Sequence, residues 1–325
     1  MKRREFMSLL GGAAAAWPVG AHGQTLPVVG YLGAGSVASD VDRVSGFREG
    51  LRQSGYVEDR DVSVKYRWAE NRQDQFLAFA SELAALPAEV IVAAGGTASA
   101  LAAQRATRTI PIVFAVGNDP VKFGLVASLN KPGGNLTGVS SLSNILVAKQ
   151  FEILNEAFPK IGTLGFLANV NNPNADTDTA EAGQAARSLS KQLLVLEASN
   201  DSQLDSAFEK LIRERIGALV VAADPFFMDR RDKLITMSDQ HALPTVYDRP
   251  EWVSAGGLMS YGTSITDTFR QVGLYTGRIL KGERPEDMPV QQAVKIVLAL
   301  NLKAAKRLGA SFPAMLLARA DEVIE

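Results

Sequence analysis

Cysteine is absent from all 325 residues, and histidine occurs only twice. Without cysteine the chain can form neither a disulfide nor a cysteine-ligated metal site, and it offers no thiol for a lipid anchor. Of the two histidines only His241 follows the first two dozen residues, and no acidic or nucleophilic partner for it is evident. Neither a catalytic triad nor a transition-metal site is therefore expected.

Nucleotide-binding motifs and an excess of charge are lacking as well. The glycines Gly30, Gly33 and Gly35 do not reproduce G-x-G-x-x-G, and no G-x-x-x-x-G-K-[ST] occurs. The chain has 34 basic and 35 acidic residues, whereas a nucleic-acid-binding protein normally has a strongly basic face. We expect no cofactor, no metal and no nucleic-acid partner.

No apolar run reaches the roughly 20 residues needed to span a bilayer. The short apolar run at residues 6–16 follows the basic stretch Lys2, Arg3 and Arg4, and small residues come after it. This order predicts a signal peptide over residues 1–23. The arginine pair resembles the twin-arginine export signal, with an ordinary Sec leader as the alternative. The protein is expected to be soluble and free in the periplasm, with no lipid anchor.

From Val28 onward, short β-branched runs alternate with amphipathic segments, a pattern typical of parallel α/β folds. In the first half we expect strands at 28–34, 62–68, 90–94, 110–116 and 137–140, with helices between them. In the second half we expect strands at 163–169, 193–197, 218–222 and 245–247. Two similar halves in series predict an α/β protein of two Rossmann-like lobes with parallel sheets, and a cleft between the lobes.

The last part of the chain is too short for a third lobe, so it is expected to cross back between the first two. Three hinge crossovers are predicted, near Pro159, Gly262 and Met288. The N-terminal lobe would then comprise residues 27–158 plus 263–288, and the C-terminal lobe residues 159–262 plus 289–325.

Small polar residues gather where the predicted strands end. Thr97 follows two glycines, and Asp119 and Asp224 each precede a proline at equivalent strand ends of the two halves. Each feature has a purely structural alternative, because Thr is a common helix N-cap and Asp-Pro often starts a turn. Ligands of open α/β sheets bind beyond the carboxyl ends of the strands, which favours a binding role. We expect a small ligand with at least one carboxylate or hydroxyl.

Several longer stretches resemble the ABC transporter substrate-binding protein family that includes tryptophan/tyrosine-type uptake proteins. The resemblance covers essentially the whole chain after the leader. Its most specific stretches are Pro132-Gly133-Gly134-Asn135-Leu136-Thr137-Gly138, Asn171-Asn172-Pro173-Asn174, Ala223-Asp224-Pro225-Phe226-Phe227 and Gly256-Gly257-Leu258-Met259-Ser260-Tyr261-Gly262.

The resemblance implies a type I periplasmic-binding fold whose lobes close around a small molecule. It also implies a monomer that performs no chemistry and delivers its ligand to a membrane permease with its ATPase. An aromatic amino acid would suit the aromatic residues together with Asp224 or Glu251. The ligand contacts implied by matching position are Ser36, Thr97, Asp119, Ser140, Asn172, Asn174, Asp224, Phe226, Tyr247 and Tyr261.

Two other functions are compatible with this fold. A ligand-sensing regulator would need a DNA-binding helix-turn-helix where this sequence has an export leader. A periplasmic enzyme would need an acid/base pair in the cleft, and no such pair is evident in the sequence.

The leader hypothesis predicts a mature protein that begins between His22 and Thr25 and is recovered from the periplasm. N-terminal sequencing of the natively expressed protein measures this directly. Replacing Arg3 and Arg4 by Lys should block export only if the twin-arginine route is used. A cytoplasmic product that retains Lys2 would contradict the hypothesis.

Overall fold

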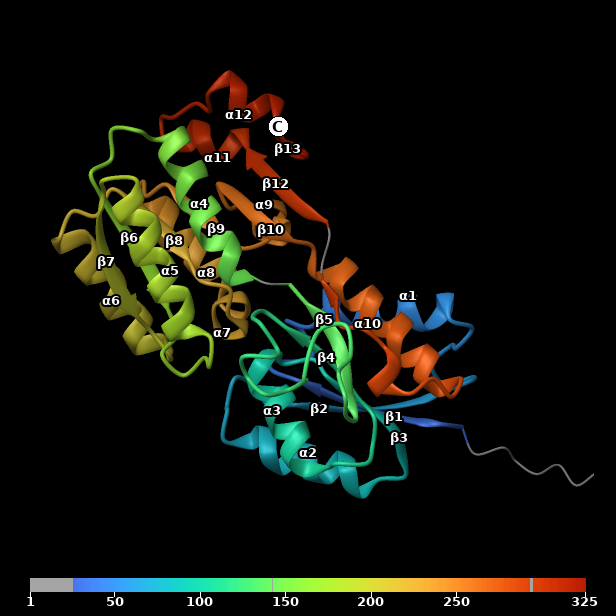
Figure 1. Ribbon diagram of the computed structural model, residues 1–325. Helices are drawn as coiled ribbons and strands as arrows, with labels where there is room; N and C mark the ends of the chain where they lie inside the picture. The colour runs from blue at the N-terminus through green and yellow to red at the C-terminus, as the bar shows by residue number, and fades with distance from the viewer. Residues whose placement is uncertain (1–25, 142, 293–294) are drawn as a thin grey trace, which may run out of the picture.

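The computed structural model describes residues 26–141, 143–292 and 295–325, so the predicted leader at 1–23 lies outside the described residues. Figure 1 shows two α/β lobes, each built on its own sheet. The first sheet has six strands in the order β11-β5-β4-β3-β1-β2, and the second has seven in the order β13-β12-β10-β9-β8-β6-β7. Within these ranges no helix combines the length and the apolar character needed to cross a membrane.

The first lobe is a parallel sheet covered by helices on both faces. Its strands are β1 (Val28–Gly33), β2 (Ser63–Trp68), β3 (Ala88–Ala93), β4 (Ile112–Val116), β5 (Leu136–Ser140) and β11 (Gln291–Gln292). The helices α2 (Gln75–Ala85) and α3 (Gly96–Ala106) share one hydrophobic core, and α1 (Val41–Gln53) and α10 (Ile265–Leu280) share the other. A short 3-10 turn at Pro285–Asp287 precedes β11. Burial on both faces explains why these strands are continuous apolar runs rather than alternating ones.

The second lobe repeats this plan and adds an antiparallel edge. Its parallel strands are β6 (Thr163–Ala168), β7 (Gln192–Glu197), β8 (Ala218–Val221), β9 (Thr245–Tyr247) and β10 (Met259–Thr263). Strand β12 (Ile296–Asn301) runs antiparallel to β10, and β13 (Glu322–Ile324) runs parallel to β12. The helices are α4 (Ser143–Ala157), α5 (Ala175–Ser188), α6 (Asp201–Arg213), α7 (Pro225–Asp229), α8 (Arg231–Gln240), α9 (Pro250–Ser254), α11 (Leu302–Arg307) and α12 (Ala314–Ala318).

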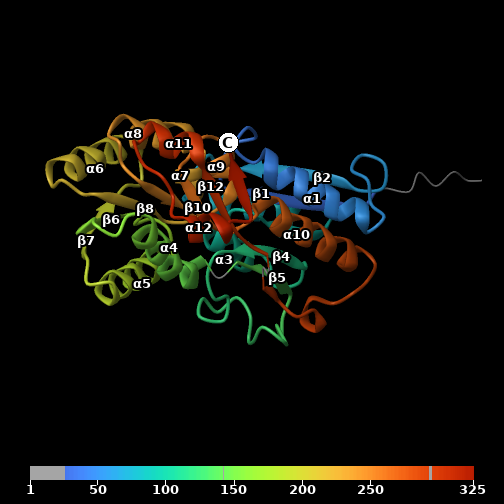
Figure 2. The same ribbon diagram turned by 90° about the horizontal axis from the view of Figure 1, so that it is seen from above.

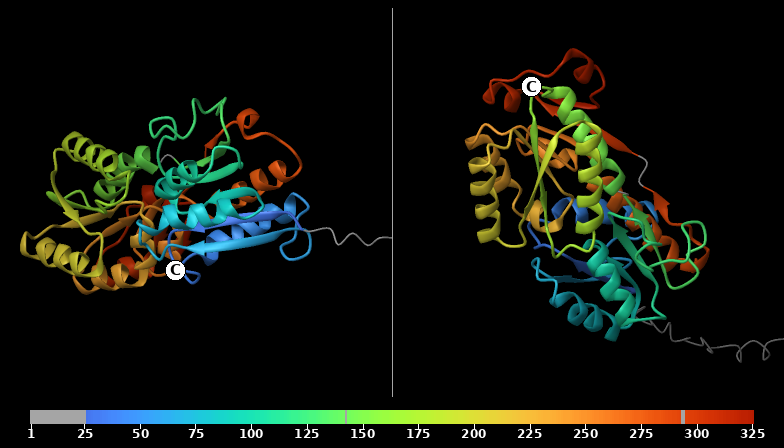
Figure 3. Two further views of the ribbon diagram at one scale, coloured as in Figure 1. Left: turned by 90° about the horizontal axis from the view of Figure 1, so that it is seen from below. Right: turned by 60° about the vertical axis from the view of Figure 1, so that its left-hand side comes forward.

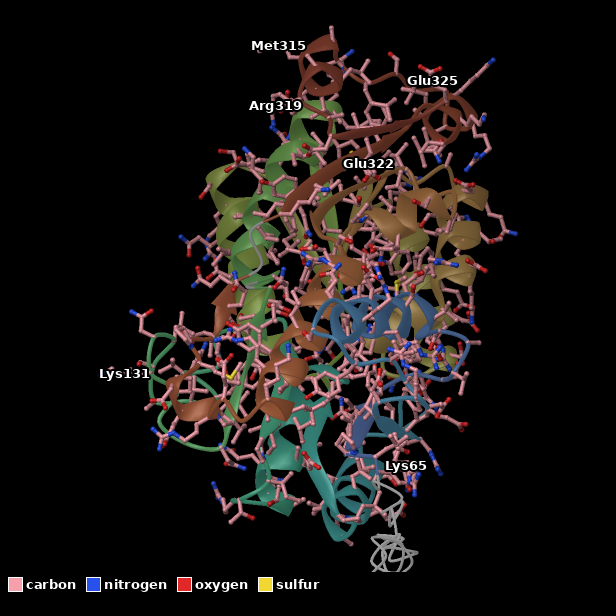
Figure 4. All side chains as sticks on the ribbon, turned by 90° about the vertical axis from the view of Figure 1, so that its right-hand side faces the viewer. Lys65, Lys131, Met315, Arg319, Glu322 and Glu325 are labelled. Atoms are coloured by element: carbon pink, nitrogen blue, oxygen red, sulfur yellow. The ribbon has the colours of Figure 1, made fainter. Side chains whose placement is uncertain are left out.

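The C-terminal segment completes the second lobe. Figure 4 shows Met315, Arg319 and Glu322 together at one end of the molecule, with Lys65 and Lys131 toward the other end. Arg319 forms an ion pair with Glu156 at the end of α4, 3.0 Å apart. The end of the chain thus packs on the lobe that holds β6 to β10.

Along the chain the described elements change from one lobe to the other three times, and two of these changes differ from the predicted positions. The first lies between β5 and α4 rather than near Pro159, because Phe151 and Leu154 of α4 are buried in the core of the second lobe. The crossing predicted near Gly262 lies between β10 and α10. The third comes between β11 and β12 rather than near Met288, because β11 pairs with β5 of the first sheet.

These cores also bear on the lobe limits. The predicted limits, 27–158 plus 263–288 and 159–262 plus 289–325, assign α4 to the first lobe. We propose instead that the first lobe comprises residues 26–141 plus 264–292 and the second residues 143–263 plus 295–325, since each helix then packs on the sheet of its own lobe.

Helices α1 and α10 run side by side, as Figures 1 and 2 both show, although more than 200 residues separate them in the sequence. Glycines allow their backbones to touch. A Cβ atom added to Gly46 would lie 2.2 Å from the carbonyl oxygen of Thr266, and one on Gly50 would lie 2.0 Å from that of Arg270. This contact holds the returning helix α10 on the first lobe after the chain has left the second.

We expect Gly50→Ala to lower the free energy of unfolding by about 1–3 kcal/mol, because the new methyl group would overlap the α10 backbone. Gly183→Ala on α5 is the matched control, since the nearest atom to its new methyl group is the end of the Arg187 side chain at 3.4 Å. Alanine should stabilise that helix slightly. Denaturant unfolding of both variants measures the difference, and equal stabilities would contradict close packing of α1 on α10.

Candidate ligand-binding cleft

A cleft lies between the two lobes where the carboxyl ends of both sets of strands face each other. The volume of the cleft is about 110 Å³. The first lobe contributes the loops after β1, β2, β3, β4 and β5, and the second contributes the loops after β6, β8, β9 and β10. The right-hand panel of Figure 3 shows the two lobes lying close together around this region. The position agrees with the rule that open α/β sheets bind ligands at this edge.

Five of the ten residues singled out by the sequence line this cleft. Thr97 stands at the start of α3 in the first lobe. The other four belong to the second lobe, where Asn172 and Asn174 follow β6 and Asp224 and Phe226 follow β8. The glycine, Asn and Asp-Pro signals at these strand ends therefore located half of the predicted set.

The other five predicted residues are absent from the cleft lining described by the structure. Each makes a local contact that explains its place. Ser36 pairs with Ser39, Asp119 accepts from the backbone N–H of Val121, and Ser140 donates to the Asn118 carbonyl. The ring of Tyr247 stacks on Trp252 at 4.4 Å within the core, and the Tyr261 carbonyl accepts from Gln150.

Asp224 is almost fully buried and held by four hydrogen bonds. Its Oδ1 accepts from the backbone N–H groups of Phe226 and Phe227 and from the Asn169 amide, so the side chain caps α7. Its Oδ2 accepts from Asn172 at 2.7 Å. Burial raises the pKa of the carboxyl, and these hydrogen bonds oppose that rise. Every hydrogen-bond donor that the structure describes for Asp224 is neutral, so no cation is bonded to its carboxyl group there.

Arg249, which the sequence reasoning missed, lines the same cleft directly after β9. Its Nε and Nη2 both donate to one oxygen of Asp248, whose other oxygen accepts from the Trp252 indole at 2.9 Å. Its Nη1 is buried and has no hydrogen-bond partner in the described structure. An unpaired guanidinium donor is a strong site for a carboxylate. The signal in the sequence was the Asp248-Arg249-Pro250 run at a strand end.

A second arginine and three aromatic rings complete the lining. Arg43 of α1 pairs with the buried carboxylate of Asp40 at 2.5 Å and lies 6.0 Å from the Phe269 ring. Phe76 and Phe269 come from the first lobe and Phe226 from the second. The cleft therefore combines apolar ring faces with two cationic groups.

Several of the described hydrogen bonds join the lobes, and three of them are between side chains on opposite sides of the cleft. Thr97 donates to Asn174 at 3.1 Å, and Asn71 donates to Asp229 at 2.7 Å. Lys122 donates to Thr177 at 2.9 Å. Direct bonds of this kind require the lobes to be in contact, so this structure is a closed arrangement of the two lobes.

Asp178, in the first turn of α5, is a buried carboxyl close to this region. Its Oδ1 has no hydrogen-bond partner among the described residues. Burial raises the pKa of Asp178 to about 7, and the charges of Asp224, Glu181 and Asp248 add to the rise. The folded protein therefore holds a proton on Asp178 that the unfolded chain loses near its ordinary pKa of 3.8.

This proton makes stability depend on pH. Because the pKa is higher in the folded state, the free energy of unfolding falls as pH rises from about 4 to about 7 and then levels off. Asp178→Asn should remove this loss and raise the free energy of unfolding at pH 8 by about 1–3 kcal/mol, with a smaller gain at pH 5. Denaturant titrations at both values test it, with the exposed Asp176→Asn as control. A variant no more stable at pH 8 than wild type would contradict the burial argument.

Comparison with known proteins places this architecture in a family. Residues 36–324 match the model of the family described as ABC transporter substrate binding protein. A tyrosine-binding protein of Clostridioides difficile is 26% identical over 263 residues, which are 81% of this chain and 75% of that protein.

Two solved structures are similar over 92% of this chain and all of theirs. A conserved domain protein of Vibrio cholerae O1 biovar eltor has a TM-score of 0.85 at 27% identity. An ABC domain from Streptococcus pneumonia, solved in complex with L-Trp, has a TM-score of 0.83 at 25% identity. The architecture is the type I periplasmic-binding fold predicted from the sequence. Because the family model matches nearly the whole chain and the fold agrees, the chain belongs to the ABC transporter substrate-binding protein family.

Proposed function

We propose that this protein captures an aromatic α-amino acid between its lobes and presents it to an ABC permease driven by its ATPase. The observation that carries the proposal is a pair of polar groups at the cleft, one donor and one acceptor, that retain hydrogen-bonding capacity. Arg249 has an unpaired donor, and Asp224 is held only by neutral donors among the described residues. An α-amino acid has one group of each sign to match them.

The ligand carboxylate is assigned to Arg249. Asp248 holds two of its guanidinium nitrogens and so fixes the plane of the third, Nη1. The side chain is only 13% exposed, so an anion bound there would be screened little by water. A hydrogen bond to a charged group typically contributes about 1.5–3 kcal/mol.

The ligand ammonium is assigned to Asp224. Its Oδ2 accepts one described hydrogen bond, from Asn172, and retains acceptor capacity. A carboxylate that is 4% exposed is costly to keep charged without a cation, which a bound ammonium would supply. The side chains of Asn172 and Asn174, beside it, add further polar groups at this end of the cleft.

The apolar part of the ligand is assigned to the space among Phe76, Phe226 and Phe269. Aromatic rings pack well against one another in tilted or offset arrangements, and this favours an aromatic side chain. The names of two similar proteins support the same class, because one is a tyrosine-binding protein and the other was solved with L-Trp.

The remaining parts of the proposal concern where and how the protein acts. We place it in the periplasm as an exported protein without a cysteine-linked lipid anchor, because its N-terminal residues resemble a leader and it has no cysteine, and we propose that it acts as a monomer. We assign it no catalytic activity, since the matching family is described by substrate binding. Thr97 and Asn174 would then act in closure, as they bond to each other across the cleft.

Isothermal titration with L-tryptophan, L-tyrosine and L-phenylalanine tests the proposal. Arg249→Met and Asp224→Asn should each weaken binding roughly ten- to a hundredfold, the equivalent of one hydrogen bond to a charged group. Arg231→Met is the matched control, because Arg231 pairs with the exposed Asp232 outside the cleft. Circular dichroism and melting curves of each variant separate lost binding from lost folding.

Ligand analogues test the assignment of the two charges. Tryptamine lacks the carboxylate and indole-3-propionate lacks the ammonium, so both should bind at least tenfold more weakly than L-tryptophan. If tryptamine binds as tightly as L-tryptophan, Arg249 does not bind the ligand carboxylate. If no aromatic amino acid binds at all, the proposed ligand class is wrong.

A further inference from the structure

Helix α7 has a cleft-lining residue at its beginning and a bond to the opposite lobe at its end. Phe226 lines the cleft, and the guanidinium of Arg230 lies 4.4 Å from the centre of its ring. Asp229, three residues after Phe226, accepts the hydrogen bond from Asn71 of the first lobe. The short helix α7 therefore carries both contacts: Phe226 would pack on a ligand, and Asp229 bonds to the opposite lobe.

Asn71 is aimed at Asp229 by an unusual stretch of backbone. Glu70 and Asn71 both have left-handed conformations, with φ of 49° and 60°. Backbone hydrogen bonds from Glu70 to Gly35 and from Asn71 to Ala34, 3.0 and 2.7 Å long, hold this turn against the end of β1. Left-handed non-glycine residues are strained and persist where the surrounding structure enforces them, often at functional positions. The turn makes Asn71 part of the cleft lining, with its side-chain amide bonded to Asp229.

The far side of the bond is equally well held. Asp229 also accepts from Arg230, and Arg230 in turn pairs with Asp201 of α6. Closure brings Asp229 near a second carboxylate, Asp40. The pKa of Asp40 is raised by burial first, and the charge of Asp229 is among the lesser causes. Without a donor between the lobes, closing them would place like charges together with less compensation.

We infer that the Asn71–Asp229 hydrogen bond is a closure latch: it stabilises the closed lobes through α7 and slows ligand release through the bond itself, not through a ligand contact of either residue. The inference rests on the proposed function for the identity of the ligand. Asn71 and Asp229 are positioning residues, because their effect passes through α7 to Phe226. Their loss should raise the dissociation rate and open the lobes, with little change in the stability of the ligand-free fold.

The test combines binding kinetics with a mutant cycle. Asn71→Gly removes the amide and still permits the left-handed backbone. Asn71→Gly and Asp229→Ala should each raise the dissociation rate of L-tyrosine about three- to tenfold in stopped-flow measurements. The double variant should be no faster than the faster single one, because both changes break the same bond. Additive effects of the two substitutions would overturn the latch.

A charge exchange separates the latch from a merely structural role. Asn71→Asp alone faces Asp229 with a second carboxylate and should release L-tyrosine faster than Asn71→Gly does. Combining it with Asp229→Asn restores one donor and one acceptor in reversed order, and the slow rate should return at least in part. Lys122→Ala is the matched control, since it removes another bond between the lobes that does not involve α7. Its rate should change less than that of Asn71→Gly.

Lobe closure itself can be measured without any ligand. The chain has no cysteine, so Ala78→Cys on α2 and Ser206→Cys on α6, both exposed, give one spin label on each lobe. Double electron–electron resonance measures the distance between the two spin labels. A population with the shorter distance of the closed lobes is expected, and Asn71→Gly should reduce it both without ligand and with L-tyrosine. Distance distributions that are the same with and without the substitution would overturn the latch. Failure of the wild type to bind L-tyrosine would instead count against the proposed ligand, and the ligand-free distances would still decide the latch.

Discussion

The buried pair of Asp248 and Arg249 is the interaction on which both the cleft and its hinge depend. Both residues are largely removed from water, and two buried charges are tolerated only when they are paired and hydrogen-bonded. Asp248 meets this condition by binding two nitrogens of Arg249 and the indole of Trp252. The same geometry leaves the Nη1 atom of Arg249 without a hydrogen-bond partner in the described structure. The unpaired donor in the cleft is thus a consequence of how the pair is held.

The hinge follows from the same short segment. A Cβ atom on Gly262 would lie 1.6 Å from the carbonyl oxygen of Asp248, so β10 can pass the end of β9 only with glycine at this position. Three residues after Asp248, Glu251 accepts from the backbone N–H of Ile265 at 3.0 Å, where the chain enters α10. Arg249 therefore lies in the sequence between Asp248, against which β10 packs, and Glu251, which bonds to the start of α10. The residue assigned to the ligand carboxylate and the contacts made at the hinge thus belong to one short segment of the chain, residues 248–251.

The fold could be predicted well from the sequence because short stretches of sequence indicate each strand and helix. Buried parallel strands are continuous β-branched runs, and most of the expected strands match the observed ones to within about two residues. The crossings were harder to predict. Nothing local distinguishes a helix on the first sheet from one on the second, and the side chains of α4 are buried by residues distant in the sequence. The glycines of α1 and α10 likewise could not be interpreted from the sequence, because their role is to let these two distant helices pack closely.

The candidate site was only half predictable, for a related reason. Small polar residues at strand ends, such as Thr97 and Asn172, are recognisable because that edge of the sheet is defined by topology. Tyr247 fits the same pattern but points into the core, where it stacks on Trp252. Side-chain direction at a strand end depends on one residue of register. Arg249 was missed because an Asp-Arg pair reads as an ordinary surface ion pair until burial is known.

The charged groups Asp224 and Arg249 are held rigidly by the residues around them. A general base must accept a proton during the reaction, so it needs an acceptor whose partners can change. Asp224 is instead fixed by four donors, two of them backbone groups that cap α7 and cannot move without unwinding it. Arg249 is fixed by Asp248 in the same way. Groups held this rigidly lose little entropy when a ligand arrives, which strengthens binding. Their rigidity therefore suits them to the recognition of a ligand.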